Sequence, residues 1–177
     1  MGNAVQAHFS LRIPSSQLEA WSLRNRDDSW EILEREIGAQ TRSRGWLNKA
    51  EFLALCEWKS PRSRHQCREN SAEFVCDVTR VAFLTSSEIL RIEILTLLHG
   101  VGWPTASTIL HFCHPQPYPI IDFRALWTLK SDVPNQYTFS FWWNYTKFCR
   151  SLAAKTKLSM RKLDMALWQY SKENQTT

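Results

Sequence analysis

The chain has 177 residues, of which 44% are hydrophobic, enough for one domain of ordinary size or two small lobes with a real core. Its 22 Lys and Arg residues against 17 Asp and Glu residues give a net charge of +5, which favours an anionic partner. The five cysteines are far apart and never form a CxxC pair. This spacing argues against a zinc site, an iron–sulfur cluster or a disulfide framework and favours a reducing compartment.

The N-terminal sequence lacks a charged segment followed by an apolar one, and no apolar run is long enough to span a bilayer. Gln6 stands where a myristoylation motif needs Ser or Thr. We therefore expect a soluble, cytoplasmic monomer that binds no membrane, nucleoid-associated if it is bacterial.

Apolar residues in the first half recur at helical spacing, and no Asn-Gly or Asp-Gly hairpin signal occurs. The spacing predicts helices at about 15–23, 28–37, 48–58 and 67–83. The sequence TRSRGW ends the second helix, and Pro61 ends the third because it disfavours helix in the residue before it. Thr85 and Glu88 have capping-box spacing, which predicts another helix that ends at the sequence HGVG.

In the second half, Pro104 suits the first turn of a helix at 103–113. The three prolines of HPQPYP predict an extended loop, after which Asp122 can cap the helix FRALWTLK. Helices are also expected over FSFWWNYTKFCRSLAA and LSMRKLDMALWQYSKE, the last one capped by Ser159. The pattern predicts an all-α, two-lobed helical bundle. The hairpin lobe is expected at about 48–130, and the second lobe at 1–47 plus 131–177.

The stretch LHGVGWPTA, residues 98–106, holds two of the five glycines of the chain. A helix that ends in Gly-Val-Gly and restarts at once is typical of a helix-hairpin-helix, in which glycines permit positive φ and leave backbone N–H groups uncovered. These donors would lie at the N-terminus of the next helix, where a phosphate fits. The alternative is a tight connection between two helices without a ligand.

The pattern L-x-G-V-G-x-x-T-A, followed by Y-P-I-I-D with Asp122 eighteen residues after Pro104, resembles the helix-hairpin-helix DNA glycosylase superfamily. The likeness is to the branch of endonuclease III and the adenine glycosylase MutY, and it covers about residues 85–130 clearly. It implies that Asp122 is the catalytic carboxylate, although the aspartate also suits a plain helix cap. It further implies that the hairpin residues contact DNA, namely Gly100, Val101, Gly102, Trp103 and Thr105.

The chain departs from this family at two places. Where the bifunctional members have a lysine nucleophile, this chain has Pro104, which has no amine to form a Schiff base. We therefore expect a monofunctional enzyme that leaves an abasic site without cutting the strand. The C-terminal half has only Cys113 and Cys149, too few for the family's four-cysteine cluster, so we expect neither a cofactor nor a metal.

The substrate implied by the resemblance is double-stranded DNA with a flipped base, which glycosylases hold between aromatic or apolar side chains. Candidates for such a pocket are Trp58, Tyr118, Trp168 and Tyr170, each of which also suits core packing. Lys59 and Arg62 in WKSPRSRH are candidate phosphate contacts, with a solvated basic loop as the alternative. Arg124 is expected either to pair with Asp122 or to contact the DNA backbone.

These features favour a monofunctional DNA glycosylase that hydrolyses the N-glycosidic bond of a modified or damaged base. A role in base excision repair or in defence against phage with modified DNA is compatible with this chemistry. The alternative is a non-catalytic helix-hairpin-helix DNA-binding module, and a third class is a helical protein-interaction domain. The retained aspartate favours the enzyme, while the hairpin and the scattered basic residues support both DNA-binding interpretations.

Overall fold

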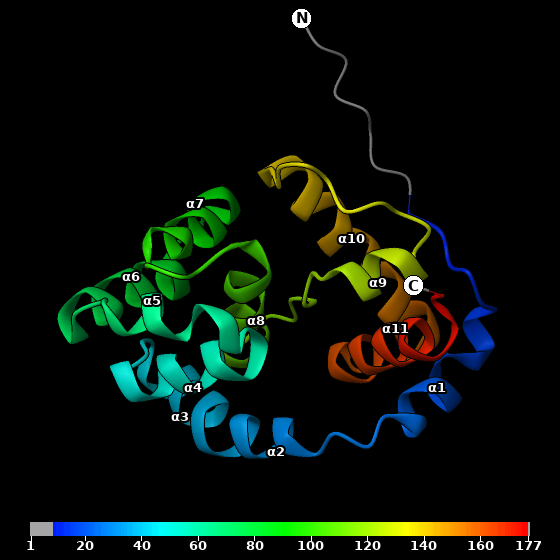
Figure 1. Cartoon of the computed structure of the whole chain (residues 1–177), viewed down its shortest axis with the longest axis horizontal. Coiled ribbons are helices and arrows are strands. Elements are labelled where there is room, and N and C mark those ends of the chain that lie inside the picture. Colours follow the sequence, from blue (N-terminus) through cyan, green and yellow to red (C-terminus); the bar gives the residue numbers. More distant parts are fainter. Residues whose placement is uncertain (1–8, 177) are drawn as a thin grey trace, which may run out of the picture. The chain divides into compact units, whose positions relative to one another are not determined.

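Residues 9–176 are described by the computed structural model. Every regular element in this range is helical and no strand occurs there (Figure 1), which confirms the predicted all-α fold. The chain forms two compact units. We call Asp27–Tyr118 the central unit, and the described part of Met1–Arg26 together with Pro119–Thr177 the terminal unit. No helix in the described range is long and apolar enough to cross a membrane.

Short helical segments joined by short connections make up the central unit. In chain order they are α2 (Ser29–Leu33), η2 (Glu34–Gly38), α3 (Ala39–Arg44), α4 (Lys49–Lys59), η3 (Pro61–Ser63), α5 (Arg64–Arg68), α6 (Ala72–Leu84), α7 (Glu88–Glu93), η4 (Ile94–Leu97) and α8 (Trp103–Cys113). The first three run on as one helix with a π-helical turn in its middle. The break predicted at TRSRGW comes only at Gly45, which has a left-handed φ of 84°. The helix continues that far because Thr41 packs fully buried against the core.

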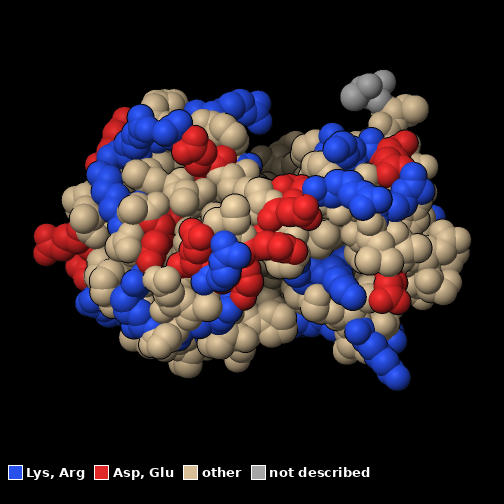
Figure 2. Space-filling model, turned by 90° about the horizontal axis from the view of Figure 1, so that it is seen from below, with Lys and Arg blue, Asp and Glu red and all other residues tan. Residues whose placement is uncertain are grey.

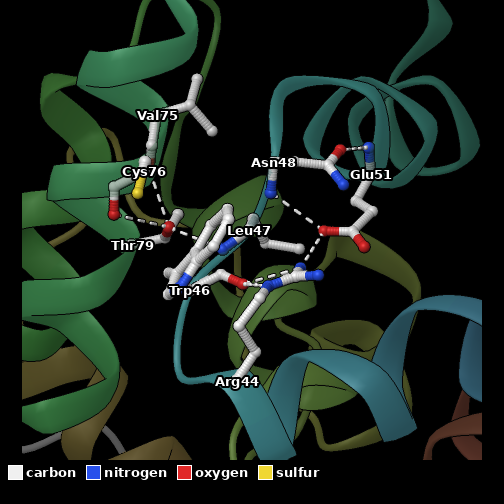
Figure 3. Close-up of polar contacts among 8 residues, drawn as sticks. All are labelled: Arg44, Trp46, Leu47, Asn48, Glu51, Val75, Cys76 and Thr79. Atoms are coloured by element: carbon white, nitrogen blue, oxygen red, sulfur yellow. Dashed lines mark hydrogen bonds and ion pairs between the residues drawn. The ribbon is translucent and has the colours of Figure 1, made fainter.

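The connection between α3 and α4 is held by a polar network (Figure 3). Asn48 caps α4 by accepting the N–H of Glu51 at 2.9 Å, and the Glu51 carboxylate accepts the N–H of Asn48 at 2.9 Å. The same carboxylate forms an ion pair with Arg44, whose guanidinium also donates to the carbonyl of Trp46. This capping box leaves α4 a well-defined start.

Thr79, which is fully buried on α6, fastens this connection to the core (Figure 3). Its hydroxyl accepts the N–H of Leu47 at 3.0 Å and donates to the carbonyl of Val75 at 2.7 Å. One hydroxyl therefore satisfies a buried backbone donor outside α6 and one acceptor within it. As a result, the chain enters α4 at a fixed position on α6.

The helix predicted at 67–83 is wrong in its first part, because the chain breaks between α5 and α6. The side chain of Ser71 accepts the N–H of Phe74 at 3.1 Å, so α6 has its own N-cap there. Asn70, just before that cap, turns its side chain to backbone groups outside α6. Local polar side chains therefore ended one helix and started another inside a run with continuous helical spacing.

The capping box predicted from Thr85 and Glu88 is also wrong. The N-cap of α7 is Ser87, whose hydroxyl accepts the N–H of Leu90 at 3.3 Å. Thr85 instead accepts the N–H of Ser87 at 3.1 Å and so shapes the turn that leads into the helix. The last part of the predicted helix is a 3₁₀ turn, η4, which ends before Leu98.

The terminal unit combines segments from both ends of the sequence. Its elements are η1 (Ser15–Gln17), α1 (Leu18–Arg24), α9 (Phe123–Thr128), α10 (Phe139–Thr156) and α11 (Met160–Asn174). Within it α1 and α9 both pack against α11 (Figure 1). The N–H groups of Ser10 and Arg12 donate to the carbonyls of Leu129 and Thr128 at 3.0 and 2.9 Å. These bonds tie the first described residues to the end of α9.

Candidate functional site

The predicted hairpin lies in the central unit, where the chain passes from η4 through residues 98–102 into α8. The N–H of Val101 donates to the carbonyl of Leu98 at 3.1 Å and closes the turn. Only Gly100 uses a positive φ, of 78°, whereas Gly102 has φ −94° and ψ 178° and stands at the N-cap of α8. The two glycines therefore have different conformational roles.

Their surroundings differ as well. A Cβ atom at Gly100 would lie 2.7 Å from the Sγ and 2.9 Å from the backbone nitrogen of Cys67, and 3.0 Å from the carbonyl oxygen of Ser63. A Cβ at Gly102 would meet only the Cδ of Pro104 at 3.8 Å, and Gly102 is exposed. The fold itself thus requires glycine at Gly100, while nothing within the described residues requires it at Gly102.

The first turn of α8 leaves backbone donors without partners. Gly102 has no side chain to cap the helix, and Pro104 has no N–H. Among the residues the structure describes, no group accepts the N–H of Gly102 or of Thr105. Thr105 is only 4% exposed, so Gly102 is the accessible donor of the two. Val101 and Thr105 are buried, and the N–H of Val101 is used by the turn.

Asn70 holds the turn in place, a role that was not predictable because Asn70 falls inside the helix expected at 67–83. Its amide donates to the carbonyl of His99 at 3.0 Å and to that of Cys67 at 2.9 Å. Its side-chain oxygen accepts the N–H of His99 at 2.9 Å. Asn70 is only 2% exposed, so these three bonds are shielded from water. His99, which lies inside the turn, is therefore fixed through both its N–H and its carbonyl.

The basic segment WKSPRSRH lies beside this turn, because Ser63 and Cys67 of η3 and α5 pack under Gly100. Arg62 in η3 is exposed and forms no ion pair with a described residue. Lys59, the last residue of α4, is half-buried. The hairpin and this basic segment, both expected to contact phosphates, are therefore neighbours in the structure.

Two of the four candidate pocket aromatics belong to the central unit. The indole of Trp58 donates to the hydroxyl of Ser29 at 2.8 Å and packs edge-on against Phe112, with ring centroids 5.4 Å apart. Tyr118 is completely buried, and its hydroxyl donates to the Glu88 carboxylate at 2.7 Å. Tyr118 therefore packs in the core, while Trp58 keeps a partly exposed ring.

A buried charged cluster in this unit was not predicted from the sequence. Arg91 is 4% exposed and donates to the carbonyl of Ala82 at 2.9 Å, and its Nε lies 3.4 Å from the carboxylate of Glu88. The Nε2 of His114 lies 2.7 Å from Arg91. Burial and this neighbouring cation lower the pKa of His114 to about 4. The cluster joins the end of α6 to α7 and keeps the imidazole neutral near neutral pH.

Asp122 belongs to the terminal unit and begins α9. Its Oδ1 accepts the N–H of Ala125 at 2.8 Å, which confirms the predicted helix cap. The side chain is half-buried. Burial, with the nearby Asp122 carboxylate as a further cause, raises the pKa of Tyr137 to about 12. Tyr145, fully buried, donates its hydroxyl to the carbonyl of Ile120 at 2.8 Å, and burial raises its pKa as well. Asp122 therefore lies among phenols that stay protonated.

Arg124 does not pair with Asp122. Its guanidinium lies over the rings of Phe123 and Trp168, 5.0 and 5.3 Å from their centroids. The ammonium of Lys172 lies 5.0 Å from the same Trp168 ring. Phe123 was not a candidate from sequence, yet it directly follows Asp122 and its ring is 53% exposed. The start of α9 thus carries an exposed aromatic ring next to the carboxylate.

Tyr170 lies between two tryptophans of the same unit. Its ring centroid is 5.1 Å from that of Trp21 and 5.9 Å from that of Trp127. Arg24 and Arg12 lie over the outer rings, 4.4 and 4.3 Å from the centroids of Trp21 and Trp127. The ring faces of Tyr170 are therefore occupied by neighbouring aromatic side chains, which favours its packing role.

Charged groups elsewhere on the molecule are mixed in sign. On the face that Figure 2 shows, Lys and Arg side chains lie in small groups separated by acidic and uncharged ones. Within residues 9–176, no group of three His, Cys, Asp or Glu side chains is arranged to hold a metal ion. All five thiols are free, and four of them are buried.

No protein-family model matches the chain, and no curated protein and no solved structure matches it either. The central unit contributes a glycine turn with an exposed donor at Gly102. The terminal unit contributes Asp122 at the start of α9, with the exposed ring of Phe123 beside it.

Proposed function

We propose that this protein is a monofunctional DNA glycosylase of the helix-hairpin-helix superfamily, acting on a flipped modified or damaged base in double-stranded DNA. The observation that carries the proposal is the glycine turn before α8, whose second glycine, Gly102, is exposed and not required by packing. The sequence likeness over about residues 85–130 supports it, because that segment also holds Asp122 at the family's spacing.

The turn would bind a phosphate of the DNA backbone. A phosphate oxygen accepts hydrogen bonds from uncapped N–H groups at a helix N-terminus, where the helix dipole also favours an anion. Gly102 presents such a donor, and the absent Cβ lets a phosphate approach closely. The exposed Arg62 on the neighbouring segment would add a charge-assisted contact. These contacts position the DNA and carry no information on base sequence.

Asp122 would assist hydrolysis at the sugar. The bond between C1′ and the base nitrogen breaks, its electron pair leaves with the base, and positive charge develops on the sugar. An ionised carboxylate stabilises that charge and accepts a proton from the attacking water. The water oxygen bonds to C1′, and the proton ends on the base nitrogen. The products are a free base and an abasic site in an intact strand, because Pro104 provides no amine for a lyase step.

Base binding would fall to aromatic residues that are at least partly exposed. In the terminal unit these are Phe123, which follows Asp122 directly, and the half-buried Trp168. Arg124, which lies over both rings, would add a positive charge beside the base. In the central unit, Trp58 remains a candidate on the same grounds, since its ring is partly exposed.

A non-catalytic DNA-binding module is the second candidate, and the Asp122 hydrogen bond to Ala125 favours it. A carboxylate that caps α9 has a structural reason to be there without any chemistry. The two candidates share the glycine turn and differ only in what Asp122 does.

The test is to incubate the protein with duplexes that carry different modified bases and then reveal abasic sites with alkali. Asp122→Asn keeps a capping side chain but removes the charge, so we expect base release to fall by about 10²–10⁴-fold while the fold is retained. Asp132→Asn, at an exposed carboxylate of the same unit, serves as the matched control and should release base normally. The strand should stay intact until alkali is added.

Equal base release by Asp122→Asn and the wild type would exclude the aspartate from the chemistry. Binding of duplex DNA without abasic sites on any substrate would favour the non-catalytic module instead.

A further inference from the structure

The two units differ sharply in charge. The terminal unit has twelve Lys and Arg residues against five Asp and Glu, a net charge of +7. The central unit has ten against twelve, a net charge of −2. The positive excess of the chain therefore lies in the terminal unit, away in sequence from the glycine turn. A partner that is attracted by charge should meet that unit first.

Within the terminal unit, α10 and its C-cap combine four cations with no acidic residue. This helix contains no acidic residue, and its cations are Lys147, Arg150 and Lys155, followed by Lys157 at its C-cap. The three lysines are exposed, and none of them forms an ion pair with a described residue. Ser151 and Ala154, both exposed, lie between them, so the helix presents one open polar face.

Three of the eight other cations of this unit are engaged in ion pairs. Arg24 pairs with Glu173, and Lys162 lies 3.8 Å from Glu19. Arg161 pairs at 2.8 Å with an aspartate on its own helix. Of the helices of this unit, α10 with its C-cap holds the largest group of cations without an acidic residue on the same element.

An aromatic pair borders these cations. The guanidinium of Arg150 lies 5.6 Å from the ring centroid of Trp143. Trp143 in turn stacks on Phe139, with centroids 6.2 Å apart and an angle of 12° between the planes. Both rings are partly exposed. Cations interleaved with aromatic rings are the combination that proteins use to follow a nucleic-acid strand without reading its sequence.

We propose that Lys147, Arg150, Lys155 and Lys157, which we call the α10 face, bind the phosphate backbone of a nucleic acid independently of its sequence. The residues span ten positions, about 15 Å along a helix, which allows contacts to several phosphates of one strand. The choice of DNA as the partner rests on the proposed function. The α10 face extends that function to a surface that the family resemblance does not assign.

An anionic lipid surface would also attract these charges, but the aromatic rings that border them, those of Phe139 and Trp143, are half-buried and stack on each other. Helices that lie in a membrane interface insert large apolar side chains beside their cations. The large side chains of α10 opposite the lysines, Trp142, Tyr145 and Leu152, are buried in the unit. Its exposed positions include Ser140, Ser151 and Ala154. The α10 face therefore suits phosphates in water.

The test is binding of an undamaged, fluorescein-labelled DNA duplex, measured by anisotropy over a range of KCl concentrations. The variant carries Lys147→Ser, Lys155→Ser and Lys157→Asn, the last because Asn tolerates the left-handed φ of 57° at that C-cap. Removing three phosphate contacts should lower the slope of log K against log salt by about 2.7 and weaken binding at least about tenfold in low salt.

The matched control removes three exposed cations from the central unit through Arg35→Ser, Arg68→Ser and Arg80→Ser. It has the same net charge as the α10 variant and should keep most of the wild-type slope. A third variant, with arginine at all three lysine positions, should bind like the wild type. Equal losses in the first two variants, an unchanged α10 variant, or tighter binding to phosphatidylserine vesicles than to the duplex would overturn the proposal.

This experiment separates the α10 face from the glycosylase. If no modified duplex loses a base but the α10 variant binds undamaged DNA more weakly than the wild type, the α10 proposal is supported and the enzymatic proposal is contradicted. If bases are released and the α10 variant binds DNA normally, the reverse holds.

Discussion

The central and terminal units use their charged residues in opposite ways. The central unit has a net charge of −2 and buries Arg91 in a cluster with Glu88 and His114. The terminal unit has a net charge of +7 and keeps Arg12 and Arg24 over surface tryptophans. The glycine turn lies in the acidic unit, so under the proposed function it would bind DNA without help from the net charge of that unit. A phosphate bound there would be held by backbone donors, while long-range attraction comes from the other unit.

The largest effect should come from the buried charge. Arg91→Ala removes the buried donor to the carbonyl of Ala82 and leaves the half-buried Glu88 without its cation, which we expect to lower the free energy of unfolding by about 3–5 kcal/mol. Arg24→Ala breaks an exposed pair with Glu173 in the terminal unit and should cost less than about 1 kcal/mol. Urea unfolding followed by circular dichroism measures both. Similar losses would mean that the two units do not differ in how their charges stabilise them.

The two glycines of the turn should separate stability from binding. Gly100→Ala forces a Cβ against Cys67 and onto a positive φ, so we expect a loss of about 2–4 kcal/mol in the free energy of unfolding. Gly102→Ala should change stability by less than about 0.5 kcal/mol, since its Cβ would make only an ordinary contact with the Cδ of Pro104 at 3.8 Å.

A bulkier residue at Gly102 then tests the phosphate contact. Gly102→Val should weaken binding of every duplex sequence to a similar degree, with an unchanged melting curve, as measured by anisotropy and by circular dichroism. Loss of binding for one base sequence alone would contradict a backbone contact.

A smaller effect is expected from pH. The pKa of His114 is lowered to about 4 in the folded unit, below its ordinary value of 6.5, so its neutral form is the one that the fold stabilises. This contribution is complete above about pH 6.5 and is lost as the pH falls toward 4, by on the order of 2–3 kcal/mol. Urea unfolding at several pH values should show that His114→Gln flattens this fall relative to the wild type. The exposed His65 provides the control, and its Gln variant should follow the wild-type curve.

Elements marked by local signals were predictable from the sequence. Pro104 and the glycines before it placed the start of α8 at Trp103, and the serine before Met160 placed the start of α11. The cap at Asp122 was predicted for the same reason. Such signals act within one turn of helix, so a single stretch of sequence contains them.

Features that depend on distant partners were not predictable. The helix breaks at Asn70, whose side chain forms hydrogen bonds with the backbone of His99, 29 residues further on. Arg91 is buried because His114 lies beside it, 23 residues away. How the charge divides between the two units depends on which segments pack together, so it could not be predicted from the net charge of the chain. In the candidate site, Asp122 and the glycines were predicted from the sequence, but Phe123 was not. Its exposure depends on how the residues around it pack.

Because Ser10 and Arg12 donate hydrogen bonds to the end of α9, the two units of the chain can fold at different times during synthesis. Residues 9–26 leave the ribosome long before α9, α10 and α11, against which they pack, have been made. The contiguous segment Asp27–Tyr118 has all its partners as soon as it emerges. The unit with the glycine turn can therefore fold during translation, whereas the unit with Asp122 has to wait for the last helix of the chain.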